Sequence, residues 1–403
     1  MRLYQLALTR DTTLEAARNQ RDAAIEARPQ ALAQWLPQLS VAGSRTREVH
    51  LNANGTGYGL TLTQAVWSYE AFSQLKEADA QVASAEATYI GAQQDLLLRL
   101  AQAYLAVLGA QDQSSTVHLE RDAYAQQLKQ TQDRERTGVG SRSDVEQAKS
   151  FYDMTAQSLI SAQDALDDAE LALATIVGEP PGHIAPLVDQ IPLTAPDPAS
   201  ADAWVDSALH DSPQIRAATL NAEAAQRDIS VQRGKAMPTI SLAGSDSRAS
   251  GPFPMGDDNA TATVGLYLNW PLFQGGAVSS AVRQSRALYH QAETSLEACK
   301  RDKVKQTRAA YRNIVTGIES INATRIAKES ADIAMQTARH DIEFNVAPVF
   351  VLLQYQAQYY VAVNAYEQAR YRYLANVLLL KQQAGRLAEQ DLEMIDALLV
   401  SRH

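Results

Sequence analysis

The side chains that could do chemistry in this chain are its seven histidines, one cysteine and 46 carboxylates, and they do not gather at the spacing of a reactive site. The histidines are His50, His118, His183, His210, His290, His340 and His403. None stands at metal-ligand spacing from another histidine or a carboxylate, so no metal site is expected. Cys299 is the only cysteine, which excludes a disulfide framework and a thiolate metal centre.

Two further segments resemble reactive motifs without their context. The Gly-rich sequence GTGYG at 55–59 is followed by a strand pattern instead of a helix, so it does not predict a phosphate-binding loop. The acidic sequence DALDDAE at 164–170 is most simply a solvated helix face. Because no nucleophile, general base and orienting group occur together, the sequence predicts no enzyme and no cofactor.

Charge and hydropathy exclude two more classes of protein. A net charge of -10 over 403 residues disfavours nucleic acid as a partner, because binding phosphates requires clustered Lys and Arg. The richest apolar run, at 96–110, is interrupted by Arg99 and Gln102, so no transmembrane helix is predicted. The first residues, MRLYQLALTRD, show neither the apolar core nor the cleavage site of a signal peptide.

The elements that would position any functional residue occur twice along the chain. LPQLSVAGS at 36–44 returns as MPTISLAGS at 237–245, and GLTLTQAVW at 59–67 corresponds to GLYLNWPLF at 265–273. Between the copies, the segment 178–200 carries six prolines and is predicted to be a linker. We therefore divide the chain into a first repeat at 1–177, this linker, and a second repeat at 201–403.

Each repeat begins with a helix and continues into a hairpin. The capping box TTLE at 12–15 introduces the first helix, and Ser212 with Pro213 introduces its counterpart. Pro37 and Pro238 end these helices, after which apolar and polar residues alternate as in strands. The predicted strands are about 38–48, 57–66, 239–248 and 261–270.

A very long helix follows each hairpin. The segment 68–136 contains no proline and would form a rod on the order of 100 Å long. Gly138 and Gly140 end it, and SDVE at 143–146 is predicted to cap the returning helix. That helix carries a heptad stripe typical of a coiled coil, formed by Tyr152, Thr155, Leu159, Ala162, Leu166, Ala169, Leu173 and Ile176. The second repeat has a looser stripe, formed by Tyr359, Ala362, Tyr366, Ala369, Tyr373 and Leu380.

Four strands are too few to close a membrane barrel, so several chains would have to contribute. Strands of about ten residues, one apolar face and nearby Trp67, Trp270 and Phe273 are typical of membrane-spanning strands with an aromatic belt. A soluble hairpin that packs on the helices is the alternative.

The order of these elements resembles that of the TolC-like outer-membrane channel family over essentially the whole chain. The phrases that carry the resemblance are LPQLSVAG at 36–43, AQAYLAVLGA at 101–110, RTGVGSRSDVEQAK at 136–149, WPLFQGG at 270–276 and ARYRYLANVLLLKQQAGRLAEQDL at 369–392. The start of the chain resembles that of a mature family member from which the signal peptide has been removed, and no N-terminal cysteine supports a lipid anchor.

The resemblance implies a mainly helical fold in which three chains of four antiparallel strands close a 12-stranded barrel in the outer membrane. Long coiled helices would form a tunnel through the periplasm. The expected function is a passive exit duct for drugs, small molecules or polypeptides, in a tripartite efflux pump or a type I secretion system. Its expected partners are a periplasmic adaptor, an inner-membrane pump of the RND, ABC or MFS type, and outer-membrane lipid.

Under this resemblance, each strand presents one face to lipid and one to the lumen. The residues expected to face lipid are Leu39, Val41, Leu60, Leu62, Ile240, Leu242, Val264, Leu266 and Leu268. Those expected to face the lumen are Ser40, Thr61, Thr63, Ser241, Tyr267 and Asn269. A soluble coiled-coil scaffold or adaptor is the competing hypothesis, and it would tolerate charge at Leu60, Leu62, Leu266 and Leu268.

The resemblance also implies a periplasmic gate, from which this sequence departs. Asp144 and Ser143 match residues of the family's closing contacts, whereas the aromatic partner falls on Phe344, which has no hydroxyl. The constriction aspartates fall on Val351 and Gln354, so a ring of negative charge is not expected. Both tips are about two residues shorter than usual in the family.

Two further expectations concern these tips. A hydrophobic seal would be formed by Val346, Pro348, Val349, Phe350 and Val351, and such a constriction gates by dewetting. The alternative is that these residues pack between helices and gate nothing. Arg142 is expected to meet a negatively charged adaptor loop or to remain solvated.

Overall fold

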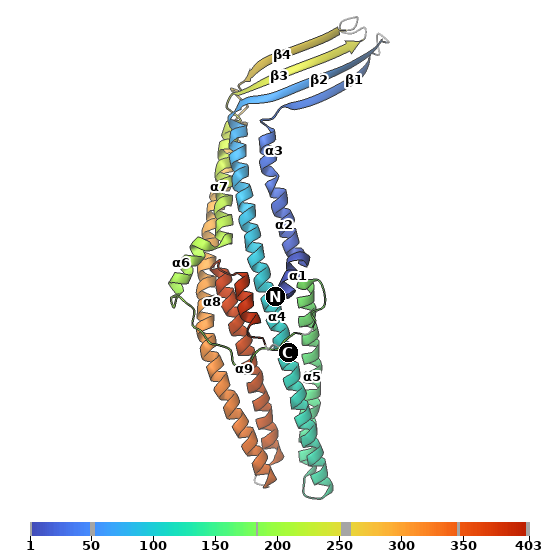
Figure 1. Cartoon of the computed structure of the whole chain (residues 1–403), viewed down its shortest axis with the longest axis vertical. Helices are drawn as coiled ribbons and strands as arrows, with labels where there is room; N and C mark the ends of the chain where they lie inside the picture. Colours follow the sequence, from blue (N-terminus) through green and yellow to red (C-terminus); the bar gives the residue numbers. More distant parts are fainter. Residues whose placement is uncertain (1, 49–52, 183, 251–258, 345–346, 400–403) are drawn as a thin grey trace. The chain divides into compact units, whose positions relative to one another are not determined.

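The computed structural model describes residues 2–48, 53–182, 184–250, 259–344 and 347–399. Its helices are α1 Arg2–Arg10, α2 Thr12–Ile25, α3 Ala27–Ala33, α4 Tyr69–Arg136, α5 Arg142–Val177, α6 Ala201–Asp211, α7 Pro213–Gly234, α8 Ala277–Glu343, α9 Val349–Gln383 and α10 Glu389–Asp396. Its strands are β1 Gln38–Glu48, β2 Ala53–Ser68, β3 Thr239–Ser250 and β4 Asn259–Asn269. The predicted class, mainly helical with four antiparallel strands in the chain, is confirmed (Figure 1).

Two compact units make up the chain. The sheet unit comprises Ala17–Ile90 and Pro213–Lys300, and the coil unit comprises Met1–Ala16, Gly91–Ser212 and Arg301–His403. This division follows contacts in space, and each unit draws segments from both sequence repeats. Of the helices in the described part of the chain, none has the length and apolar character needed to cross a membrane.

The sheet unit contains all four strands in the order β1-β2-β3-β4, with every neighbouring pair antiparallel (Figure 1). The register places Leu39 opposite Leu62 and Leu242 opposite Leu266. Because directly opposed residues of antiparallel strands share a face, this register decides which side chains gather on each side of the sheet. β2 and β3 are longer than predicted, and β4 begins earlier, at Asn259.

A β-bulge interrupts β2 where it leaves the sheet. Ala65 pairs with Ser241, and the next pairing joins Trp67 to Ile240, so Val66 is the inserted residue. Without the insertion, the period of two would place Trp67 on the face of Thr61 and Thr63. The bulge therefore moves Trp67 to the face of Ile240.

The helices of the sheet unit hold the ends of the strands through close backbone packing. Ser68 directly precedes α4, and its hydroxyl oxygen accepts a hydrogen bond from the Ala71 amide at 3.1 Å. Gly234, at the end of α7, lies so close to α4 that an added Cβ would stand 2.7 Å from the Cα of Glu70. A larger residue at this position would push the two helices apart.

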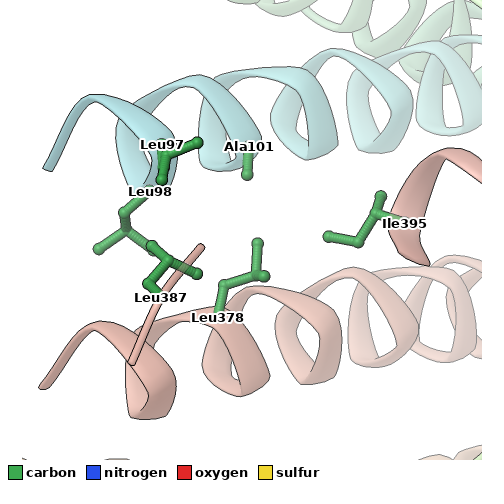
Figure 2. Packing of buried hydrophobic residues seen from close by; sticks show 6 residues of the cluster. All are labelled: Leu97, Leu98, Ala101, Leu378, Leu387 and Ile395. Atoms are coloured by element: carbon green, nitrogen blue, oxygen red, sulfur yellow. The ribbon is translucent and has the colours of Figure 1, made fainter. Parts of the chain in front are cut away.

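The core of the coil unit is divided into small clusters of leucine, alanine and tyrosine. In the cluster of Figure 2, α4 supplies Leu97, Leu98 and Ala101. They pack against Leu378 of α9, Leu387 of the segment between α9 and α10, and Ile395 of α10. A second cluster joins Tyr124 of α4 and Ala148 of α5 to Val349 and Leu353 of α9. The third joins Ala338 and Ile342 of α8 to Leu352 of α9. Each cluster is only a few residues wide, as expected where helices pack in pairs.

The predicted heptad stripe of α5 is confirmed by its burial, because every member from Tyr152 to Ile176 is buried or half-buried. The predicted cap of this helix is wrong by two residues. Ser141, and not Ser143, is the N-cap, since its hydroxyl accepts from the Asp144 amide at 3.1 Å while the Asp144 carboxylate accepts from the Ser141 amide at 3.3 Å. The helix α5 begins at Arg142, four residues after the left-handed Gly138 and two residues earlier than the predicted cap implies.

The predicted cap of the first helix is also wrong, since α1 and α2 are separate and Asp11 stands between them. The buried Asp11 carboxylate accepts from the Leu14 amide at 2.7 Å and also receives the Arg99 guanidinium at 3.0 and 3.1 Å. A carboxylate is a stronger acceptor than the Thr12 hydroxyl, and Arg99 compensates its burial.

The proline-rich segment 178–200 is held against α9 instead of hanging free. The Thr194 amide donates to the Tyr373 hydroxyl at 3.0 Å, and that hydroxyl donates to the Thr194 carbonyl at 2.9 Å. The buried Arg370 guanidinium donates to the carbonyl of Val188 and pairs with Glu367. These bonds satisfy backbone groups that a proline-rich chain cannot satisfy through a regular ladder.

Candidate channel-forming site

All nine residues expected to face lipid lie on one face of the sheet, which we call the apolar face. Pairings across the strands join Leu39 to Leu62, Val41 to Leu60, Ile240 to Leu268, Leu242 to Leu266, and Gly244 to Val264. The β2–β3 register places Leu62 opposite Gly244, so the two hairpins present these residues on the same side. Val264 is 83% exposed and Leu266 is 68% exposed, an unusual amount of apolar surface for a strand in water.

The opposite face carries small and polar side chains. One row across the four strands consists of Ser40, Thr61, Ser245 and Thr263, and the last two hydroxyls lie 2.7 Å apart. The remaining residues expected to face the lumen belong to this face by the same register, and they are Thr63, Ser241, Tyr267 and Asn269. The separation of the two faces is what a wall between lipid and water requires.

The two ends of the apolar face differ in chemistry. Trp67 lies at the end that joins the helices, and Trp270 and Phe273 follow directly after β4, where both are exposed. At the hairpin end, the period of two continues from Val41 through Arg45 and Arg47, so these side chains share the apolar face.

Sequence reasoning missed this basic end, which also includes Arg248 opposite Tyr58. It missed it because the alternation was followed only while the residues remained apolar. The signal was present: the same period, continued into RTR at 45–47, predicts arginine on that face.

The tip between α4 and α5 holds three predicted gate residues. Asp144 is engaged in the capping box, and Ser143 accepts a hydrogen bond from the Gln147 side-chain amide at 3.4 Å. Arg142 is 85% exposed, with its guanidinium 4.0 Å from the Glu146 carboxylate. The first two therefore make local bonds within α5, while Arg142 remains available to a partner.

The tip between α8 and α9 holds the other three. Phe344 is exposed and its ring lies 4.7 Å from the His340 ring, centroid to centroid. Val351 packs against the third core cluster, and Gln354 is exposed on α9.

The expected hydrophobic seal is divided by this packing. Val349 is buried in the second core cluster and Val351 is half-buried, whereas Pro348 and Phe350 are exposed. Val346 lies outside the described residues. Two of the five expected members thus pack between helices of one chain.

Half-buried carboxyls lie in the interior of the coil unit. Burial raises the pKa of Glu120 above its usual range, and a hydrogen bond with the Tyr124 hydroxyl partly opposes this rise. Burial likewise raises the pKa of Glu367, against the attraction of Arg370. The Asp112 carboxyl lies near Glu367 and also raises the pKa of Glu367.

A sheet with one apolar and one polar face, joined to long paired helices, defines an outer-membrane channel of the exit-duct class. The model of the family described as Outer membrane efflux protein matches residues 3–179 and 204–386. The chain belongs to this family.

Curated relatives agree over nearly the full length. The chain is 28% identical to the outer membrane protein TolC of Vibrio cholerae, with 98% of this chain and 92% of the relative covered. It is also 28% identical to the alkaline protease secretion protein AprF of Pseudomonas aeruginosa, with 99% and 86% covered.

Solved structures share the fold. The outer-membrane channel CmeC of Campylobacter jejuni superposes with a TM-score of 0.82 at 15% identity, covering 98% of this chain and 88% of that one. The outer membrane protein VceC of Vibrio cholerae gives 0.81 at 20% identity, covering 95% of each chain. The protein is thus an outer-membrane exit duct for efflux or type I secretion that extends into the periplasm, and it is not an enzyme.

Proposed function

We propose that three copies of this chain form the duct, with their twelve strands closing one barrel in the outer membrane. The two-faced sheet carries the proposal, because its apolar face suits lipid and its polar face suits a water-filled lumen. The sheet order also supports it. β1 and β4 pair on one side only within the described sheet, so each offers an edge to a neighbouring copy.

Closure by identical copies preserves the antiparallel pattern. In this four-stranded antiparallel sheet, β1 and β4 run in opposite directions. The strand β4 of one copy would therefore pair antiparallel with β1 of the next. Three such contacts remove all open edges, which is a requirement for strands that cross a bilayer.

The partners we propose are a periplasmic adaptor and an inner-membrane pump of the RND, ABC or MFS type. A passive duct requires an external energy source, which in this proposal is the inner-membrane pump. Two of the curated relatives, AprF and PrtF, are named for protease secretion. Others are named as outer membrane protein TolC or as outer membrane efflux protein BepC, and one is named protein CyaE. Cargo of both kinds, small molecules or polypeptides, is compatible with a lumen face composed mainly of small and polar residues.

Trimer formation is tested by extracting the exported chain from outer membranes with detergent. We expect a heat-sensitive band of three chains on gels, together with single-channel conductance in planar bilayers. A freely soluble monomer without conductance would refute the proposal and favour the scaffold hypothesis.

We further propose that the periplasmic end is constricted without a ring of charge. Val351 and Gln354 occupy the positions that the family resemblance assigns to aspartates, and Pro348 and Phe350 supply exposed apolar surface nearby. A constriction of this kind closes by dewetting.

Two aspartates introduced at this constriction test the idea. In the variant Val351→Asp with Gln354→Asp, we expect stronger cation selectivity and a conductance that falls when divalent cations are added on the periplasmic side. A control variant, Gln358→Asp, places one negative charge one turn further along α9 and should change neither property. Unaltered selectivity in the double variant would show that the constriction lies elsewhere.

A further inference from the structure

The hairpin end of the apolar face carries a cluster of arginines that the exit-duct function does not use. Arg45 and Arg47 occupy successive positions on this face of β1, and Arg248 occupies the same face of β3. The register aligns Arg248 with Tyr58 and Gly43, one row before Arg45. We call these three residues the arginine rim.

In the described strands, the positive charge of this face is confined to the rim. The rows that contain Leu242 and Val264 carry no ionisable residue on this face in the described strands. Asp246 lies opposite Leu60 and is the acid of the face, two residues before Arg248 on β3. Within the described strands, one acid and three arginines give this face a net charge of +2.

The height of the rim corresponds to the edge of a membrane. Arg248 lies eight residues along β3 from Ile240, which is about 27 Å of strand at ~3.4 Å per residue. For strands tilted by about 40°, this is about 21 Å of membrane depth, and Arg45 lies about 26 Å deep on the same scale. The apolar band of such a barrel is about 25 Å tall. Arg45 therefore lies at the edge of the apolar band, and Arg248 lies about 4 Å inside it, from where its long side chain reaches the headgroup level.

The side of the membrane is given by the chain connections. All four strands join helices at the Trp67 end, and the helical part of the protein extends into the periplasm. The hairpin end consequently faces the cell exterior, so the arginine rim meets the outer leaflet. At the other end, Trp67, Trp270 and Phe273 provide an uncharged aromatic belt.

The arginines at one end of the apolar face, with an uncharged aromatic belt at the other, indicate that the hairpin end binds an anionic group. Guanidinium groups bind phosphate through paired N–H donors, and a basic residue at an anionic membrane surface adds about 1 kcal/mol of attraction. Arg45 and Arg248 are exposed and carry no ion pair within the described part of the chain. We propose that the arginine rim binds the phosphate groups of outer-leaflet lipid headgroups and fixes the depth of the barrel in the membrane.

The proposal depends on the proposed function in one respect, since the apolar face must be the lipid-facing one. The test begins with the full-length chain recovered from the outer membrane as a conducting, heat-sensitive trimer. If no such trimer forms, the proposed function fails. If the trimer forms and conducts, only the lipid proposal is then at stake.

The detergent-purified trimer is titrated with bisphosphorylated lipid A, with the same lipid after removal of both phosphates, and with inorganic phosphate alone. Bound lipid is counted by native mass spectrometry, and trimer stability is followed by its dissociation temperature. We expect the phosphorylated lipid to bind on the order of tenfold more tightly than its dephosphorylated form. Inorganic phosphate alone should stabilise the trimer little, because the headgroup also needs its acyl chains beside Val41 and Leu60.

Variants distinguish lipid binding by the arginine rim from a general effect of the positive charge of the protein. Arg45→Gln with Arg248→Gln should remove the preference for phosphorylated lipid, whereas Arg45→Lys with Arg248→Lys should retain most of it. Lys235→Gln removes one positive charge at the opposite end of the sheet, where Lys235 is exposed, and should leave the preference intact.

Three outcomes would overturn the proposal. The first is equal affinity of the native trimer for both forms of the lipid. The second is an undiminished preference in the glutamine variant. The third is loss of the trimer itself in that variant, since this would show that the arginines pair with carboxylates of a neighbouring copy.

Discussion

The sheet and the paired helices use the same apolar residue types in opposite ways. In the sheet, Val264 and Leu266 are largely exposed, while in the coil unit Leu353 and Leu378 are 0% and 1% exposed. The helices bury their core clusters within the chain, although Ile160, Leu171 and Val361 stay exposed, and this packing contributes to the stability of each copy. The strands keep theirs outside, where it contributes only after the chain meets lipid. Insertion and folding are thus assigned to different surfaces.

Of the changes that test this difference between sheet and helices, a charge on the apolar face should have the largest effect, because it opposes contact with lipid. Leu266→Arg places a cation in the middle of the band, which costs about 2–4 kcal/mol in each copy. We expect little or no heat-sensitive trimer in the outer-membrane fraction, measured by immunoblotting of that fraction.

Thr61→Arg provides the matched control for this variant. Thr61 is exposed on the polar face, so an arginine there should leave the amount of trimer unchanged and alter only ion selectivity. If both variants insert equally well, the apolar face does not contact lipid.

A cavity in the helical core tests the other half of the comparison. Leu353→Ala removes a fully buried side chain from the cluster around Tyr124, and such truncations cost about 2–5 kcal/mol. The melting temperature of the detergent-solubilised protein, followed by circular dichroism, should fall by several degrees.

Gln358→Ala on the same helix is the control, because Gln358 is exposed and its truncation should cost less than about 0.5 kcal/mol. A similar drop in both variants would mean that the helix pair is stabilised by contacts other than this cluster.

The sequence predicted the strands well because alternation is a local property. The spacing predicts that Leu39 and Val41 share one face of their strand and that Leu266 lies on the apolar face of another strand, and the register places all three on one side of the sheet. The heptad stripe of α5 was predictable for the same reason, since burial follows the period of a helix.

The features that could not be predicted depend mostly on contacts between residues that are distant in sequence. Asp11 was overlooked as a cap because its strength depends on Arg99, which lies far away in sequence. The burial of Val349 depends on Tyr124 in another helix, so the sequence left open whether it seals or packs. The bulge at Val66 carries no glycine or proline that would mark it.

A smaller effect on stability is expected at the tip of α5. Asp144 caps this helix, and the family resemblance also predicts that it takes part in closing the gate. Asp144→Ala removes one half of the capping box and should destabilise the first turn by about 1 kcal/mol. Hydrogen exchange of the amides at 142–145 should accelerate, while Asp153→Ala, an exposed site on the same helix, should have no effect there.

Channel recordings of Asp144→Ala distinguish the two roles. If Asp144 only caps the helix, the closed time of single channels should not change. A marked increase in spontaneous opening would show that it also takes part in the closing contact predicted from the family resemblance.

The smallest expected effect is the pH dependence of the helix pair around Glu120. Burial raises the pKa of this carboxyl above its ordinary value of 4.5, so the folded chain binds the proton more tightly than the unfolded chain. The resulting stabilisation is fully present below the unfolded pKa and is lost as the pH rises through the folded pKa. The neighbouring groups are His118, which lies 3.2 Å from the Asp122 carboxylate, and Tyr360, whose pKa is raised by burial and by Glu120.

Glu120→Gln should remove this part of the pH dependence. Between about pH 4 and 7, the melting temperature of the native protein should decline more than that of the variant, because glutamine has no proton to lose. Glu135→Gln changes an exposed acid of the same helix and should leave the difference intact. Parallel curves for the native protein and Glu120→Gln would indicate that Glu120 is solvated in the assembled duct, where the helical interior would then be as accessible to water as the polar face of the sheet.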